Sequence, residues 1–233
     1  MQLSGIKKST LLDYPGKVAT IVFTAGCNLR CGYCHNSEFV LPEKIQKICH
    51  DFISEEVFFR FLKTRTGFLD AVVICGGEPT LQSDLPDFCR RIKELWFLVK
   101  LDTNGSTPKV LDNLLDENLL DYVAMDVKYS LDRYEELSGK HIDIGLYKAS
   151  IEIIKTRLPD YEFRTTVIKW VHSKEDIESI AQTISWAKNY YLQNYRSGNT
   201  LDPNFVWDSF LESELLELQA IAAPYVEKCG IRM

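Results

Sequence analysis

Short apolar runs alternate with segments of helical periodicity along most of the chain. The apolar runs are rich in β-branched and aromatic residues and end at glycines or polar residues, a pattern typical of buried strands. They predict six strands, at residues 17–24, 69–75, 97–103, 120–128, 161–171 and 190–195.

The segments between these runs have the spacing of helices that bury one face. They predict helices at residues 54–66, 83–96, 107–118, 145–157, 173–189 and 209–222. Ser54 is the expected N-cap of the first of these helices, and Pro86 lies in the first turn of the second, where proline is tolerated.

Strands that alternate with helices at this spacing predict an α/β fold with a parallel sheet. Because a complete barrel has eight units and this pattern has six, we expect a partial (β/α)6 TIM-like barrel. The chain is expected to form a single domain, with a core at about residues 15–200 and a C-terminal extension at about 201–233. Ligands of such folds bind at the carboxyl ends of the strands.

Composition narrows the class of protein. The net charge of −6 is spread without blocks of like charge, which argues against a nucleic-acid partner. The N-terminus has no signal-like apolar region, and no run of about 18 apolar residues predicts a membrane span. We therefore expect a cytoplasmic protein whose seven cysteines are reduced thiols or metal ligands.

Three of these cysteines, Cys27, Cys31 and Cys34, follow the first predicted strand in the sequence CNLRCGYCHN. Thiolates suit either zinc or an iron–sulfur cluster. His35, or Cys49 or His50 further on, could complete a zinc site. We favour a cluster, because a tight loop with three thiolates leaves one iron open for chemistry. The loop of such a cluster would directly follow the first strand.

Two further motifs follow predicted strands. GGEPT, at residues 76–80, could be a plain turn or a place where backbone and the Glu78 carboxylate meet an amino-acid ligand. DTNG, at residues 102–105, could be a turn stabilised by its own side chains, or Asp102 could bind a ribose, an ammonium group or a cation.

Charged residues also fall within the later strands. Asp126 and Lys128 share one face of a strand, where they could form an ion pair. Arg164 interrupts an apolar run and needs an anionic partner, for which a ligand carboxylate is one candidate. The other chemically notable residues are expected to be structural: Cys75 and Cys89 as buried thiols, His50, His141 and His172 as surface or loop residues, and Trp96, Trp170, Trp186 and Trp207 as packing residues.

These motifs together resemble a known family. CNLRCGYCHN is similar to the cluster loop of radical S-adenosylmethionine (SAM) enzymes, and GGEPT is similar to their GGE motif. YCHN, GGEP, DTNG and D-x-K occur in the order found in activating enzymes of glycyl-radical proteins. TLLDYPGKVATIVFTAGCNLRCGYCHN and GNTLDP (198–203) most resemble the activating proteins of anaerobic ribonucleoside-triphosphate reductase.

The resemblance implies roles for individual residues. Cys27, Cys31 and Cys34 would hold a single 4Fe–4S cluster, and its open iron would bind SAM. The residues implied to contact SAM are Tyr33, Gly76, Gly77, Glu78, Asp102, Thr103, Lys128 and Arg164. Asp102, Thr103 and Asp126 match the positions of a monovalent cation site. No catalytic residue beyond the cluster and cofactor is implied.

The implied activity is reductive cleavage of SAM to methionine and a 5′-deoxyadenosyl radical, which takes a hydrogen from a glycine of a partner protein. The implied partners are a glycyl-radical enzyme, most similar in type to the anaerobic reductase, and an electron donor such as flavodoxin or ferredoxin. Activation of a pyruvate formate-lyase-type enzyme, or another radical SAM modification, is an alternative. A non-catalytic zinc module is the alternative from a different class. Where the formate-lyase activase pattern has a histidine after the last strand, this chain has Tyr195.

Overall fold

The computed structural model describes residues 1–198 and 200–233, which divide into two compact units. The first unit comprises residues 1–28, 36–103 and 107–123, and the second comprises residues 29–35, 104–106 and 124–233. The motif GNTLDP includes Asn199, which lies outside the described residues. Among the described residues, no helix is long and apolar enough to cross a membrane.

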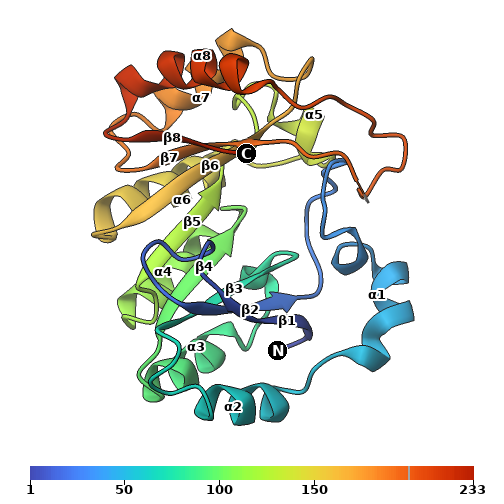
Figure 1. Cartoon of the computed structure of the whole chain (residues 1–233), viewed down its shortest axis with the longest axis vertical. Coiled ribbons are helices and arrows are strands. Elements are labelled where there is room, and N and C mark those ends of the chain that lie inside the picture. The colour runs from blue at the N-terminus through green and yellow to red at the C-terminus, as the bar shows by residue number, and fades with distance from the viewer. Residues whose placement is uncertain (199) are drawn as a thin grey trace. The chain divides into compact units, whose positions relative to one another are not determined.

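The first unit is built on strands that follow one another in chain order (Figure 1). They are β1 (Leu3–Thr10), β2 (Ala19–Thr24), β3 (Ala71–Gly76), β4 (Leu98–Thr103) and the start of β5 (Tyr122–Asp126). β1 is antiparallel to β2, with register shifts between Leu3 and Gly5 and between Lys7 and Thr10. β2, β3 and β4 are parallel, so the segments that follow them leave the sheet at the same edge.

The helical elements of the first unit are η1 (Ser37–Phe39), α1 (Pro42–Ile48), η2 (Cys49–Asp51), α2 (Glu55–Lys63), η3 (Pro79–Leu81), α3 (Leu85–Glu94) and α4 (Pro108–Asp116). The helices α2, α3 and α4 each bury one apolar face. Ser54 caps α2 by accepting a hydrogen bond from the backbone N–H of Val57. Phe58 of α2 stacks on Phe88 of α3 with ring centroids 5.4 Å apart. Both rings are buried, so they join the two helices into one core.

The second unit continues the strand order from the end of β5 through β6 (Tyr161–Val167), β7 (Tyr190–Asn194) and β8 (Cys229–Arg232). β6, β7 and β8 are parallel. Its helical elements are α5 (Tyr134–Ser138), α6 (Ile144–Arg157), α7 (Lys174–Thr183), α8 (Glu212–Ala222) and η4 (Ala223–Tyr225). α8 packs against both α7 and β8 (Figure 1).

The predicted α/β class with a mostly parallel sheet is confirmed, and β1 and β8 are the end strands of the order. The predicted number of strands is wrong, because β1 and β8 lack the long apolar run of a central strand. The helix predicted at 173–189 ends at Thr183.

The expectation that Trp96, Trp170 and Trp186 are packing residues is also wrong. Trp96, Trp170 and Trp186 are 93%, 74% and 79% exposed, and all three adopt positive φ in turns that follow a helix or strand. Trp207 is 40% exposed. The Trp207 ring lies 6.1 Å from that of Phe205, centroid to centroid, so this residue does pack on a neighbour.

Candidate functional site

In the first unit, the loop after β3 runs directly against the loop after β2. Gly77 donates its N–H to the carbonyl of Thr24 at 2.9 Å, and Glu78 donates its N–H to the carbonyl of Gly26 at 2.8 Å. A Cβ on Gly77 would lie 2.0 Å from the Gly26 oxygen, and Gly76 has φ of +118°. The two glycines are therefore required by a close approach of backbone to backbone.

Glu78 is a fully buried carboxylate that accepts hydrogen bonds from neighbouring residues. Its Oε1 accepts hydrogen bonds from the N–H of Thr80 at 3.2 Å, the hydroxyl of Thr80 at 2.6 Å and the hydroxyl of Thr103 at 2.8 Å. A buried charge is costly, and donors of this kind reduce that cost. The motif is thus more than a turn, because it fixes a carboxylate after β3.

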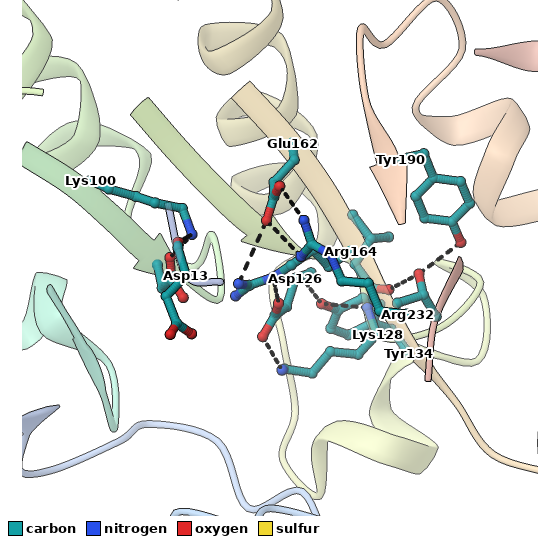
Figure 2. A network of polar contacts seen from close by, with 12 residues as sticks. Asp13, Lys100, Asp126, Lys128, Tyr134, Glu162, Arg164, Tyr190 and Arg232 are labelled. Carbon is teal, nitrogen blue, oxygen red and sulfur yellow. Dashed lines mark hydrogen bonds and ion pairs between the residues drawn. The ribbon is translucent and has the colours of Figure 1, made fainter. Parts of the chain in front are cut away.

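Asp102, at the end of β4, forms an ion pair that the sequence did not predict. Lys100 is buried, and its Nζ lies 2.9 Å from Oδ1 of Asp102. The same ammonium donates to the carbonyl of Asp13 at 2.6 Å, a contact visible in Figure 2. The alternation of side chains along a strand was the only sequence signal that Lys100 and Asp102 share a face.

The three-cysteine loop passes from one unit to the other along the chain. Cys27 belongs to the first unit, and Cys31 and Cys34 belong to the second. In the second unit, the N–H of Cys34 donates to the carbonyl of Cys31 at 3.0 Å, and the backbone N–H of Arg30 donates to the carbonyl of Ser138 at 2.7 Å.

The seven cysteines are not joined in disulfides, so the three thiols of the loop are a donor set that fits an iron–sulfur cluster. Within the described residues, no three His, Cys, Asp or Glu side chains form a group that could hold a single metal ion. Burial raises the pKa of the Cys31 thiol, an effect that nearby Lys128 partly opposes.

Tyr33, between two of these cysteines, is buried beside Lys128. The Lys128 ammonium lies 6.0 Å from the centroid of the Tyr33 ring, the outer range of a cation–π contact. Burial would lower the pKa of Lys128, but Tyr33, Asp126 and Cys31 raise it well above its usual range. Burial likewise raises the pKa of Tyr33. This lysine is therefore charged and the phenol is neutral at physiological pH.

Asp126, at the end of β5, joins two cations of the second unit, as Figure 2 shows. Arg164 donates from Nε to Asp126 Oδ1 at 2.9 Å, and Lys128 donates from Nζ to Asp126 Oδ2 at 3.3 Å. Burial would raise the pKa of Asp126, but Arg164 and then Lys128 lower it to about 2. The expected pair of Asp126 and Lys128 is confirmed, and the structure supplies Asp126 as an anionic partner for Arg164.

A second acidic group near Arg164 was not predicted. Glu162 is fully buried, and its Oε1 lies 3.8 Å from Nη1 of Arg164. Arg232 donates from Nη1 and Nη2 to the two carboxylate oxygens of Glu162, at 3.0 Å and 2.7 Å. Arg232 is the penultimate residue and lies in no recognisable motif, so no sequence signal could have identified it.

Backbone around the same residues is fixed by aromatic and imidazole groups. The Tyr134 hydroxyl lies 3.4 Å from both the Lys128 N–H and the Asp126 carbonyl oxygen. His172 lies in a loop, between β6 and α7, as one of the two predicted placements has it, and it is buried there. Its Nδ1 accepts from the N–H of Ile168 at 3.1 Å, and Nε2 therefore donates to the carbonyl of Lys128 at 3.0 Å. Of the two thiols expected to be buried, Cys89 is buried and Cys75 is partly exposed.

Relatives of this chain cover it almost completely. A protein of Methanocaldococcus jannaschii, named as belonging to the glycyl-radical enzyme activating enzymes, is 38% identical over 99% of this chain and 95% of its own length. A pyruvate formate-lyase-activating enzyme of Clostridium pasteurianum is 26% identical over 94% of this chain and 91% of its own.

The same fold occurs in a solved structure, and a family model matches most of the chain. SuiB of Streptococcus suis, in a crystal structure bound to S-adenosylmethionine, matches 91% of this chain and 52% of its own with a TM-score of 0.63 and 17% identity. The model of the radical SAM superfamily matches residues 21–187. The chain is therefore an enzyme of the radical SAM superfamily, with glycyl-radical enzyme activating enzymes among its homologues.

Proposed function

We propose that this enzyme generates a glycyl radical on anaerobic ribonucleoside-triphosphate reductase. The observation that supports this most directly is the match of nearly the whole chain to a relative named as a glycyl-radical enzyme activating enzyme. The choice of the reductase as target rests on the flanking segments TLLDYPGKVATIVFTAGCNLRCGYCHN and GNTLDP. The whole chain would act as one catalytic domain.

Cys27, Cys31 and Cys34 would hold a 4Fe–4S cluster through three of its irons. When bound, the cluster would supply the electron that cleaves SAM to methionine and a 5′-deoxyadenosyl radical. That radical would take a hydrogen atom from a glycine of the partner, giving 5′-deoxyadenosine and the stored glycyl radical. A small electron carrier such as flavodoxin or ferredoxin would reduce the enzyme.

The residues of the chain would bind and orient SAM. Gly76 and Gly77 would present backbone to its methionine ammonium, and Glu78 would add a carboxylate already held in place by Thr80 and Thr103. A fixed carboxylate is a good partner for an ammonium group, because it needs no reorganisation when the ligand arrives.

The ribose and carboxylate of SAM would be contacted by Asp102, Lys128 and Arg164, and the adenosine side by Tyr33. The raised pKa of Lys128 supports this role, since the ammonium keeps its charge over the physiological range. Asp102, Thr103 and Asp126 would be the ligands of a monovalent cation.

A second candidate function is activation of a pyruvate formate-lyase-type enzyme. It is supported by the Clostridium pasteurianum relative, which is matched over 91% of its length. At Tyr195 this chain departs from that pattern, which has a histidine there.

The test begins with anaerobic reconstitution of the full chain with iron and sulfide. We expect a brown protein with about four irons per chain, which cleaves SAM in the presence of dithionite. A colourless protein that holds zinc would contradict the proposed chemistry. Electron paramagnetic resonance of mixtures with each partner then identifies the target. A glycyl doublet on a formate-lyase-type partner, and none on the reductase, would contradict the choice of target.

A further inference from the structure

A segment of the second unit far along the chain lies against the cysteine loop. Asp202 donates its backbone N–H to the carbonyl of Gly32 at 3.0 Å. The ring of Phe205 lies beside that of Tyr33, with centroids 5.9 Å apart. We call residues 200–207 the loop clamp, because they contact the loop through both backbone and side chain.

This contact requires a residue without a side chain at position 32. A Cβ at Gly32 would lie 2.8 Å from Cδ2 of Phe205, closer than real side chains approach. The next obstacle is Cβ of Asp202, at an ordinary 3.5 Å. Gly32 is not among the residues with positive φ, so its backbone does not itself require glycine. The ring of Phe205 is the close contact that excludes a side chain here.

Tyr195 contacts the loop clamp at Phe205. This tyrosine is buried, and its ring packs on Phe205 with centroids 5.9 Å apart. Its hydroxyl donates to the carbonyl of Phe205 at 3.2 Å. The Tyr195 ring also stacks on that of His35, with centroids 6.1 Å apart. His35 directly follows Cys34, the last cysteine of the loop. Tyr195 thus connects the clamp to the end of the loop.

We propose that Phe205, supported by Tyr195 and Asp202, is a positioning residue that holds residues 31–35 in shape before any cluster is present. Cys31 is only 6% exposed, in keeping with a loop that is closed over its own thiol. A preformed loop lowers the entropy lost when metal binds, and it limits access of solvent and oxidants to the ligands. The metal-binding consequence rests on the proposed role of Cys31 and Cys34 as cluster ligands, whereas the shape of the loop does not.

The first experiment measures the loop without metal. Apoprotein is treated anaerobically with iodoacetamide, and mass spectrometry follows the modification of each cysteine. Exposed Cys49 and fully buried Cys89 provide the fast and slow references within the same molecule. We expect Phe205→Ala to speed the modification of Cys31 about three- to tenfold, as the loss of an aromatic contact predicts.

Val206→Ala is the matched control, because Val206 neighbours Phe205 but is 80% exposed. We expect it to leave the modification of Cys31 unchanged. An unchanged rate in Phe205→Ala would overturn the proposal. An equal acceleration of Cys89 would also overturn it, because the effect would then be general unfolding.

A double-mutant cycle tests whether the contact itself is responsible. Gly32→Ala should open the loop by pushing against the Phe205 ring, and the double variant Gly32→Ala/Phe205→Ala should be no worse than Phe205→Ala alone. If the double variant is clearly worse, Gly32 is required for another reason and the proposal fails.

Iron uptake separates this proposal from the proposed function. We expect wild type to bind iron and Phe205→Ala to lose it several-fold faster to a chelator. If wild type binds no iron, the proposed function fails while the alkylation result still decides the role of the clamp. Equal chelator rates for wild type and variant would show that the clamp does not protect the ligands.

Discussion

Arg232, in β8 of the second unit, binds the buried carboxylate of Glu162 with two parallel hydrogen bonds, at 3.0 Å and 2.7 Å. The Arg232 guanidinium also lies over the ring of Tyr191, 3.8 Å from its centroid. Glu162 lies two residues before Arg164 on β6. Because Arg232 pairs with the Glu162 carboxylate, that carboxylate competes less with Asp126 for Arg164. The end of the chain therefore supports the charged network of Figure 2.

Arg232→Ala should lower the free energy of unfolding by about 2–3 kcal/mol, because a buried carboxylate loses two charge-assisted hydrogen bonds. Arg164 remains near Glu162 and limits the loss. Urea denaturation measures the effect. Lys228→Ala is the control, since it removes the same charge from an exposed position just before β8. Equal stabilities of the two variants would contradict the structural role of the Arg232 pair.

Asp126→Asn should make the free energy of unfolding depend less on pH in the acidic range. The pKa of Asp126 is lowered to about 2, so the stability it contributes is complete above its unfolded pKa of 3.8 and is lost as pH falls toward 2. One third of the side chain is exposed, so we expect only about 1–2 kcal/mol at neutral pH after screening. Denaturation at a series of pH values should show the gap between wild type and variant closing between about pH 5 and pH 2. Exposed Asp132→Asn should show no such gap.

Glu78→Gln should weaken SAM binding roughly tenfold to a hundredfold, the range expected for loss of a hydrogen bond to a charged group. The amide oxygen can still accept the bonds from Thr80 and Thr103, so the fold should remain. Equilibrium dialysis of SAM against reconstituted protein measures the change. Wild-type affinity in the glutamine variant would show that the carboxylate does not meet the ammonium.

Gly77→Ala should destabilise the protein by about 2–3 kcal/mol, because its Cβ would collide with backbone and not with a movable side chain. The melting temperature reports this change, and Gly198→Ala is the control because nothing lies within 4 Å of its added Cβ. If the two alanine variants have the same melting temperature, Gly77 does not approach Gly26 as closely as described.

Cys31→Ala should abolish both the brown colour of the reconstituted protein and the cleavage of SAM. Removing one of three ligands leaves too few thiolates to retain the cluster. Cys89→Ala, in α3, is the matched control, and it should keep its colour and its iron content. Iron analysis after gel filtration decides the outcome, and a Cys31→Ala protein with full iron would rule out the ligand assignment.

The central strands could be predicted because each is a run of apolar residues with polar or glycine neighbours. The predicted strands at 69–75 and 97–103 match β3 and β4 within two residues at each end. β1 could not be found in this way, since Gly5, Lys7 and Lys8 break its alternation. β8 has only four residues, too few for a period to be visible.

The polar residues of the candidate site were found where they follow strands or stand out in an apolar run. Glu78 and Arg164 were identified for these reasons. Some of their partners were harder to find, because Arg232 and Tyr134 acquire importance only through tertiary contacts. Phe205 also lay beyond prediction, since its contact with Gly32 joins positions 173 residues apart by sequence number.

The register shifts of β1 have a consequence for how the protein behaves at high concentration. An end strand exposes unpaired backbone groups that can recruit a strand from another molecule. The irregularities between Leu3 and Gly5 and between Lys7 and Thr10 interrupt that row, and exposed Lys7 and Lys8 place positive charge along it. Two like charges and a bent strand discourage edge-to-edge pairing, so this border of the sheet is protected against aggregation by its own sequence.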